Sequence, residues 1–498
     1  MKINLLKPTL YLLWSIMLTA TVNGQWQQKG ADFFGSEFDS TGSSISVSAD
    51  GNTLAVGAYQ ADPNGSSSGN MRVFSWNGNQ WAQRGQTLEG EAANYKFGYS
   101  ASLTPDGNRL AVGATGAMAG GRASAGHVKV FEWNGTSWQQ LGPTIGGVLN
   151  DINSGWSVSL DENGNTVAIS APLAGPSGTQ IGEVRVYTFD GTDWNQMGSA
   201  IEGENQYDYM GHCIKLSADG TRVAIGTHMN DDFATDAGSV DIYEWNGTQW
   251  NQMGNRLTGT EETDWFGKSL DFSADGNRLA IGAWHHGADR GQVRAFEWDG
   301  TQWQQLGQAI DGENDNYNFG HSVALSADGT TLVAGAVQHP GGGDLRGQTR
   351  VYRLVGNTWC QVDSGINGLV DGDFGGYNTA ISASGETVVI GMPLSSSHGT
   401  FTGAVRVYEG GVLGTQDLLA DKKILAFPNP THDRLILKLP KTSETIMVAQ
   451  YSLLGQVVAS NRYNDMAEIS FEMQGTPGLY LVYVTTRFGV QSFQILKN

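Results

Sequence analysis

The sequence predicts an all-β fold, namely a seven-bladed β-propeller closed by its N-terminal strand and followed by a small C-terminal Ig-like β-sandwich. One motif recurs seven times at intervals of 53 to 63 residues, as expected for a repeat architecture. Each copy contains four short stretches of strand-like sequence separated by turn residues, and no copy shows helical periodicity. The copies are marked by a residue pair ending in glycine, at Phe34-Gly35, Phe97-Gly98, Ser154-Gly155, Met210-Gly211, Phe266-Gly267, Phe319-Gly320 and Phe374-Gly375.

The second copy shows how one unit is built. Residues 105–108, Pro-Asp-Gly-Asn, form a tight-turn sequence, and Asn134-Gly135 is the signal of a two-residue hairpin. Such a hairpin would place Phe131 opposite Trp138. The expected strands are residues 99–103, 109–114, 126–133 and 137–141. Four antiparallel strands per copy are typical of a propeller blade.

The aromatic residues of each hairpin are expected in the core between blades. Phe131, Trp133 and Trp138 share one face, and Val128 and Val130 share the other, because side chains along a strand alternate. Both faces are apolar, as expected for a sheet packed between two neighbours. Sugar-stacking platforms are the alternative interpretation of such aromatic runs, but their spacing favours the core. The same set recurs at Phe74/Trp76/Trp81, Tyr243/Trp245/Trp250 and Phe296/Trp298/Trp303.

The two ends of the repeat array complement each other. The seventh copy ends with its third strand at Tyr408 and lacks a fourth. Residues 25–30, Gln-Trp-Gln-Gln-Lys-Gly, closely match the fourth-strand sequence Ser-Trp-Gln-Gln-Leu-Gly at 137–142. We expect this N-terminal segment to pair with the last copy and remove an exposed sheet edge.

The chain is predicted to contain four segments. Residues 1–24 are interpreted as a secretory signal peptide, because Lys2 and Lys7 precede a short apolar run. That run is too short to span a bilayer, and no other segment is apolar enough. The propeller at 25–411, a linker at 412–424 and a C-terminal domain at 425–498 follow.

Charge and cysteine usage narrow the possible partners. The formal net charge is −20, and residues 25–420 alone are near −24, which argues against nucleic acid or an anionic membrane as partner. Cys213 and Cys360 fall in different copies, so we expect two free, buried thiols and no disulfide.

From residue 425 the sequence changes to short alternating stretches at 435–439, 447–451, 456–458, 469–471 and 479–484, which indicate a small β-sandwich. Three ordered motifs occur here: Phe-Pro-Asn-Pro-Thr at 427–431 before Asp-Arg-Leu, Tyr-Ser-Leu-Leu-Gly-Gln-Val-Val at 451–458, and Gly-Leu-Tyr-Leu-Val at 478–482 before the terminal Ile-Leu-Lys. This region resembles the type IX secretion system C-terminal sorting domains. The resemblance implies recognition by outer-membrane secretion machinery and delivery to the surface or surroundings of a Gram-negative cell. An ordinary adhesive Ig-like module is the alternative.

The repeats resemble the FG-GAP units of integrin-α-like propellers. The resemblance rests on Phe97-Gly98, on Asp-Gly-Asn at 106–108, on Leu-Ala-Val-Gly-Ala at 110–114 and on Gly-His-Val at 126–128. Calcium-binding members of that family carry several closely spaced aspartates in the first turn. Here the corresponding turns contain one, as in Ser-Ala-Asp-Gly at 48–51, so we carry over no calcium site and expect no cofactor.

One face of the predicted propeller varies between copies and is the expected binding face. It carries the loops between second and third strands, and the connections from each fourth strand to the next copy. The opposite turns are nearly uniform. The varying loops are residues 60–70, 115–125, 228–238, 284–291, 338–347 and 393–403.

Aromatic residues and carboxylates gather in these loops and connections, a composition found at sugar- and cation-binding sites. The alternative is a solvated acidic rim with tyrosines packed between blades. Adjacent histidines without a partnered ligand set argue against a metal at 285–286. The candidate ligand-binding residues are Tyr95, Tyr207, Asp208, Tyr209, Asp264, Trp265, Trp284, His285, His286, Asp315 and Tyr317.

No nucleophile–base pair, phosphate loop or paired-carboxylate motif stands out in the sequence. The sequence therefore favours a secreted or surface-displayed binding protein that presents one face to a glycan or protein. The first alternative is a carbohydrate-active enzyme that uses Glu204, Asp208, Glu262 or Asp264. The second is a structural component of an extracellular matrix.

Overall fold

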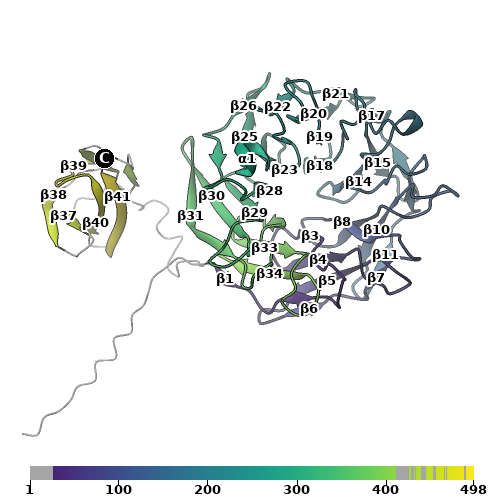
Figure 1. The fold of residues 1–498 in the computed structure, drawn as a ribbon, viewed down its shortest axis with the longest axis horizontal. Helices are drawn as coiled ribbons and strands as arrows, with labels where there is room; N and C mark the ends of the chain where they lie inside the picture. Colours follow the sequence, from purple (N-terminus) through teal and green to yellow (C-terminus); the bar gives the residue numbers. More distant parts are fainter. Residues whose placement is uncertain are drawn as a thin grey trace, which may run out of the picture. The chain divides into compact units, whose positions relative to one another are not determined.

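The computed structural model describes residues 26–410, and in the C-terminal region residues 425–427, 431, 433–438, 445–452, 456–464, 466, 468–486 and 489–497 (Figure 1). The predicted signal peptide and linker lie outside the described residues. The chain divides into two compact units, residues 1–411 and 412–498. Among the described helices, none has the length and apolar character needed to cross a bilayer.

The described strands of the first unit form seven antiparallel sheets, which follow one another around a central axis (Figure 1). The first sheet contains β3 (Ser44–Val47), β4 (Thr53–Ala58), β5 (Asn70–Trp76), β6 (Trp81–Gln83) and β7 (Leu88–Glu89). The second contains β8 (Phe97–Leu103), β9 (Arg109–Ala114), β10 (His127–Trp133), β11 (Trp138–Gln140) and β12 (Ile145–Gly146). The third contains β13 (Val158–Leu160), β14 (Thr166–Ala171), β15 (Glu183–Phe189), β16 (Trp194–Gln196) and β17 (Ile201–Glu202).

The remaining sheets follow the same order. The fourth contains β18 (Cys213–Leu216), β19 (Arg222–Thr227), β20 (Ser239–Trp245), β21 (Trp250–Gln252) and β22 (Leu257–Thr258). The fifth contains β23 (Ser269–Phe272), β24 (Arg278–Ala283), β25 (Gln292–Trp298), β26 (Trp303–Gln305) and β27 (Ile310–Asp311). The sixth contains β28 (Phe319–Leu325), β29 (Thr331–Ala336), β30 (Gln348–Val355) and β31 (Thr358–Asn367). The seventh contains β32 (Asn378–Ile381), β33 (Thr387–Met392), β34 (Ala404–Glu409), β1 (Gln27–Gln28) and β2 (Phe33–Phe34).

The hairpin between third and fourth strands is longer than the sequence predicted. Trp133 pairs with Trp138, and Phe131 pairs with Gln140, so four residues form the connection instead of two. The Asn134 side chain explains the difference, because its oxygen accepts hydrogen bonds from the backbone N–H groups of residues 136 and 137, at 2.9 Å each. The aromatic residues still share one face and pack in one core cluster.

Tryptophans join each sheet to the preceding one. The buried Trp138 packs between the first and second sheets, and its indole N–H donates to the Arg84 carbonyl at 2.9 Å. The indole of Trp81 donates in the same way to the Lys29 carbonyl, at 2.8 Å, in the segment between β1 and β2. Repeated apolar faces of this kind leave the first unit with a core between every pair of adjacent sheets.

Two of the seven predicted starting points shift. Phe34 lies in β2, which pairs with β34, so the first copy begins instead at Thr41-Gly42. The seventh begins at Gly376, one residue after the predicted pair. The intervals between equivalent glycines then become 56, 57, 56, 56, 53 and 56 residues. The predicted first interval of 63 residues was irregular because Phe34-Gly35, at the end of β2, has the same residue pair as the true starting points.

The cysteines are free, but the prediction that both are buried is wrong. Cys213 is partly buried in an inner strand, whereas Cys360 is exposed. Cys360 lies on the outer strand β31 beside the buried Trp359, so its side chain points to the opposite, solvent-facing side.

The second unit consists of two sheets around one core. The described strands are β35 (Leu425–Phe427), β36 (Arg434–Lys438) and β39 (Glu468–Glu472) in one sheet, and β38 (Val457–Asn464), β37 (Thr445–Ser452), β40 (Gly478–Thr486) and β41 (Gly489–Lys497) in the other. Alternate residues from both sheets, such as Leu435, Val448, Phe471 and Val482, are fully buried together. Each of the short alternating stretches predicted here overlaps one of the described strands.

Candidate functional site

Backbone hydrogen bonds bring the two kinds of varying segment onto one face of the first unit. The amide of Asn94, in a connection between copies, donates to the Ser66 carbonyl in the neighbouring loop at 2.7 Å. Phe97 donates to the Ser68 carbonyl in the same way, at 3.0 Å. Equivalent bonds recur around the unit, and we call this side the loop face.

A glycine with positive φ begins every sheet and directs the residue after it toward the axis. At these positions φ lies between 85° and 91°, a backbone region that favours glycine. Adjacent sheets are also closest here, since a Cβ atom on Gly57 would lie 2.3 Å from the Gly98 carbonyl oxygen. The seven glycines are Gly42, Gly98, Gly155, Gly211, Gly267, Gly320 and Gly376.

The residues that follow these glycines line a pocket of about 500 Å³, to which every sheet contributes one. They are Ser43, Tyr99, Trp156, His212, Lys268, His321 and Tyr377. Tyr59, Trp284 and Pro393 complete the wall from the loops that follow second strands. The pocket therefore lies on the axis at the loop face, and we call it the axial pocket.

Aromatic rings surround this pocket in an almost unbroken series, which we call the aromatic belt. Successive ring centroids lie 4.4 to 5.7 Å apart, within the range of favourable ring contacts. In order, the belt contains Tyr59, Tyr99, Trp156, His212, His228, Trp265, Trp284, His321 and Tyr377.

The belt histidines are neutral. Burial lowers the pKa of His212 and of His228 well below the ordinary value, and it lowers the pKa of His321 to about 4. Burial also lowers the pKa of Lys268 to about 8, and its ammonium lies 5.1 Å from the Trp265 ring centroid. Lys268 is thus the cation of the pocket wall.

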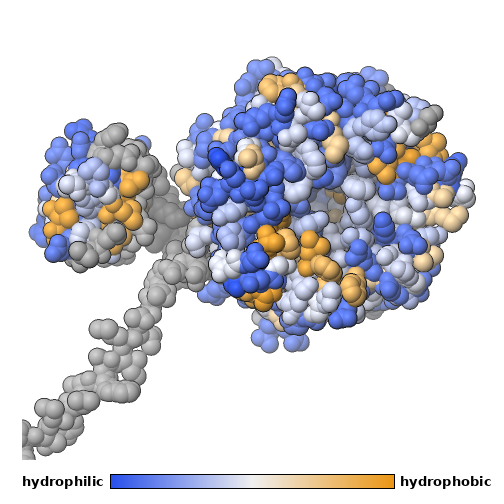
Figure 2. Space-filling model, viewed as in Figure 1, coloured by the Kyte–Doolittle hydropathy of each residue, from blue (hydrophilic) through white to orange (hydrophobic). Residues whose placement is uncertain are grey.

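Below the axial pocket the inner strands line a second space of about 310 Å³, which shares several wall residues with the first. Its wall contains the small residues Ser44, Ser46 and Ser100. An ion pair between Lys215 and Asp271, at 2.9 Å, also lies there. The two spaces form one axial depression; Figure 2 shows a hollow near the centre of the first unit.

The structure brings together only some of the residues predicted from the sequence. Trp265, Trp284 and His285 lie in or against the belt, with Trp265 and His285 rings 4.3 Å apart. The others sit further out on the loop face. Tyr95 contacts His127, Tyr209 donates to Gln180, Tyr317 contacts His339, Asp315 pairs with Arg290, and Tyr207 is exposed.

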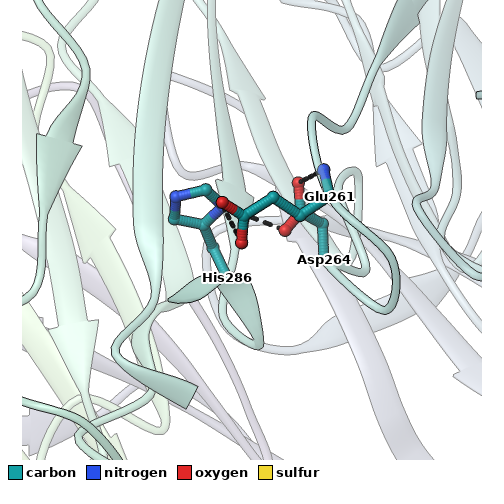
Figure 3. Close-up of side chains that lie close together, drawn as sticks. All are labelled: Glu261, Asp264 and His286. Atoms are coloured by element: carbon teal, nitrogen blue, oxygen red, sulfur yellow. Dashed lines mark hydrogen bonds and ion pairs between the residues drawn. The ribbon is translucent and has the colours of Figure 1, made fainter. Parts of the chain in front are cut away.

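Glu261, Asp264 and His286 place their polar atoms within 4.8 Å of one another (Figure 3). The single turn α1 (His286–Asp289), which is not regular helix because Gly287 and Ala288 have positive φ, positions the imidazole. Its Nδ1 lies 2.9 Å from Asp264 and 3.8 Å from Glu261. Hydrogen bonding to Asp264 raises the pKa of His286.

Asp264 fixes the conformation of its loop, and buried aspartates at equivalent positions in other copies do so without a histidine partner. Asp264 accepts hydrogen bonds from the Thr260 and Glu261 amides, at 2.6 and 2.9 Å, and so fixes its own loop. Asp373 fixes the corresponding loop and pairs with Arg406, and Asp208 accepts from Asn230. The cluster in Figure 3 is therefore one version of a loop anchor found in several copies.

The aspartates of the opposite turns are likewise engaged within their own turns. Ser48 and the amide of Asn52 donate to Asp50, at 2.5 and 2.9 Å. Burial alone would raise the pKa of Asp50, but these hydrogen bonds outweigh it and lower the pKa. This carboxylate therefore accepts hydrogen bonds from its own turn and stabilises it.

Comparison with known proteins identifies the C-terminal region. Residues 425–498 match the family described as the secretion system C-terminal sorting domain, which indicates export by the type IX system to the cell surface or extracellular space. The search of curated proteins finds no match.

Two solved structures have similar folds. One is a protein from Bacteroides uniformis ATCC 8492 assigned as a 6-phosphogluconolactonase, with 10% identity and a TM-score of 0.45. The other is the periplasmic gluconolactonase PpgL of Pseudomonas aeruginosa, with 16% identity and a TM-score of 0.45. Each comparison covers 66% of this chain and 86% of the other. At these values the two structures carry no inference about activity. The chain is thus an all-β protein of repeated antiparallel sheets that ends in a secretion system C-terminal sorting domain.

Proposed function

We propose that this protein is an exported, non-enzymatic glycan-binding protein that holds a sugar residue in the axial pocket. The aromatic belt is the observation that carries this proposal. Aromatic faces stack against the C–H faces of sugar rings, and the pocket has the volume of a typical small-ligand site. The backbone geometry repeats from copy to copy while the seven pocket positions carry five different residue types, which also fits recognition of one asymmetric ligand.

The proposed architecture is a seven-bladed propeller of FG-GAP type at residues 25–411, closed by its N-terminal strand. Pairing of β1 with β34 and the hydrogen bond from Trp81 to Lys29 support this closure. Residues 1–24 would be removed as a signal peptide, 412–424 would act as a linker, and 425–498 would adopt an Ig-like sandwich. No cofactor or calcium is assigned.

Export fixes where binding would occur. With its sorting domain recognised by the outer-membrane machinery, the propeller would be secreted or displayed on the surface of a Gram-negative cell. There it would attach the cell, or the released protein, to extracellular carbohydrate.

The loop face offers a larger contact area for a polymeric ligand. Within residues 26–410, every large apolar side chain that stands out as exposed lies on this face. These residues are Phe38, Met118, Val148, Leu149, Tyr207, Phe233, Leu369, Val370 and Phe401. Together with the predicted outer residues Tyr95, Tyr209, Asp315 and Tyr317 they would contact parts of the ligand beyond the pocket. The same exposed side chains favour a protein ligand as the second candidate.

The enzymatic alternative has weaker support. Asp208 and Asp264 are buried loop anchors on different sheets, and Glu204 pairs with Arg256 at 3.3 Å. A glycosidase requires two carboxyl groups that flank one bond, and the described residues of the axial pocket wall include no carboxylate. A matrix component remains the third candidate, for which self-association would be the signature.

A glycan array probed with the full-length protein tests the proposal, with Trp156→Ala and Trp284→Ala as pocket variants. Binding to carbohydrate that both variants weaken at least tenfold is expected. Trp298→Phe, in the outer hairpin, is the matched control and should bind normally. Turnover of a polysaccharide, or binding that ignores both pocket variants, would refute the proposal.

A further inference from the structure

The axial pocket contains one positively charged group, the Lys268 ammonium, for which a neutral sugar offers no counter-charge. Lys268 occupies the position that follows the fifth glycine, where other copies place serine or an aromatic ring. No described residue forms a hydrogen bond or an ion pair with its ammonium. Its identified electrostatic neighbours are neutral at pH 7: the Cys213 thiol, whose pKa burial raises to about 11, and the belt histidines, whose pKa values burial lowers.

A largely buried and unpaired ammonium costs stability, because burial removes its hydration without supplying a counter-charge. Three other lysines of this unit pair with a carboxylate. Lys215 pairs with Asp271 in the lower space, Lys129 pairs with Glu91, and Lys29 pairs with Glu409 at 3.3 Å. Lys268 lines a pocket whose described wall offers no carboxylate, which favours a counter-ion that arrives with the ligand.

Further polar atoms around Lys268 also lack partners. Trp284 Nε1, Thr379 Oγ1 and His212 Nδ1 are buried without hydrogen bonds, and all three residues line the axial pocket. Buried polar groups are nearly always paired, so the residues of this wall hold unused hydrogen-bonding capacity. The Trp265 ring beside the ammonium would hold it in place.

We propose that the sugar bound in the axial pocket carries one negative charge, a uronate carboxylate or a sulfate ester, and that this group pairs with the Lys268 ammonium. This inference rests on the proposed glycan-binding function. One cation matches one anionic group, and the belt histidines, being neutral, add no second positive charge.

The acidity of the protein opposes the approach of an anion but does not prevent the pairing. Charges further apart than about 8 Å are largely screened at physiological ionic strength. The axial pocket wall contains no described carboxylate, so the local field is set by Lys268.

The experiment compares matched sugars by isothermal titration calorimetry with the full-length protein. The pairs are the trisaccharides of galacturonate and galactose, of glucuronate and glucose, and of mannuronate and mannose, with 6-sulfated galactotriose as the sulfate arm. We expect at least one acidic member to bind tenfold or more tightly than its neutral partner. The carboxylate and sulfate arms show which anionic group is preferred.

Three variants link the preference to the ammonium. Lys268→Met should abolish the acidic preference while changing neutral-sugar binding less than twofold, and Lys268→Arg should retain most of it. Lys96→Gln removes the same charge from an interblade connection on the loop face outside the pocket wall, and should bind like the wild type. Thermal unfolding checks that Lys268→Met is folded, and it should be more stable because a buried charge is gone.

The outcomes separate the two proposals. Equal binding of neutral and acidic members, unchanged in Lys268→Met, overturns the charge assignment and leaves glycan binding standing. An acidic preference that Lys268→Met retains also overturns the assignment. Failure of every sugar to bind overturns both proposals.

Discussion

Lys268 determines how sugar binding should respond to pH. Its pKa of about 8 is lowered by burial, so the ammonium is present at pH 7 and is lost as the pH rises through this value. We expect the affinity for an acidic sugar to be nearly constant from pH 6.5 to 7.5 and to fall above pH 8 until it equals the affinity for the neutral partner. Calorimetric titration at several pH values measures this, and Lys268→Arg should show no decline below pH 10.

Other groups around Lys268 do not titrate in this interval. Burial keeps three belt histidines neutral above their lowered pKa values, and it raises the pKa of the Cys213 thiol to about 11. Burial likewise raises the pKa values of the belt tyrosines Tyr59, Tyr99 and Tyr377. A decline centred near pH 6 would contradict the assignment to Lys268.

Asp264 gives the second prediction at the residue scale. Asp264→Ala would leave the Thr260 and Glu261 amides and the His286 ring without their acceptor, and should lower the free energy of unfolding by about 2–4 kcal/mol. Urea denaturation measures the loss. Zinc or calcium should leave the thermal midpoint of the wild type unchanged, since we interpret this cluster as a loop anchor. A midpoint that rises with metal concentration would show instead that Glu261, Asp264 and His286 bind it.

The sequence did not reveal which residues line the axial pocket, although a repeated glycine precedes each of them. Each stands directly after a repeated glycine, and this position changes from Ser to Tyr, Trp, His and Lys while the glycine stays. Recognising them required the direction in which each first strand leaves its glycine, which is a property of the backbone. The misplaced first and last starting points also hid Ser43 and Tyr377.

At the scale of strands, local chemistry made the repeat predictable. The second strand at Arg109–Ala114 has the predicted bounds, because a tight turn and a Gly-Ala end delimit it. The register of the hairpin was predicted two residues out of place, because Asn134 uses its side chain to form a wider turn. The contact of Trp138 with the Arg84 carbonyl joins two sheets, so the sequence of either strand alone could not predict it.

The N-terminal strand gives the prediction at this scale. Removing residues 25–30 would take away β1, leave Tyr408 and Glu409 at the end of β34 unpaired and remove the Lys29 carbonyl that accepts from Trp81. Such an edge pairs readily with other chains. We expect a lower thermal midpoint and concentration-dependent association in size-exclusion chromatography. A synthetic peptide of residues 25–34 should restore the monomer and a scrambled peptide should not. A truncated protein as stable and monomeric as the full chain would contradict the role of β1.

At the scale of the whole molecule, the proposed function assigns binding to the first unit and export to the second. The first unit has its own cores between sheets, and the second has a separate core formed by Leu435, Val448, Phe471 and Val482. Because no buried residue of one core belongs to the other, each should unfold independently. Sequence motifs identified the second unit because its family motifs are local stretches of sequence, whereas the axial pocket of the first unit is formed by residues from seven sheets.

Deletion of residues 412–498 should therefore separate export from folding. The truncated protein should keep the thermal midpoint of the first unit and its sugar binding, since the axial pocket lies within residues 26–410. In the producing bacterium it should accumulate in the periplasm, because the domain that the outer-membrane machinery recognises is absent. Cell fractionation with immunoblotting measures its location, and the full-length protein is the control. Equal amounts of truncated and full-length protein outside the cell would show that export does not require the sorting domain.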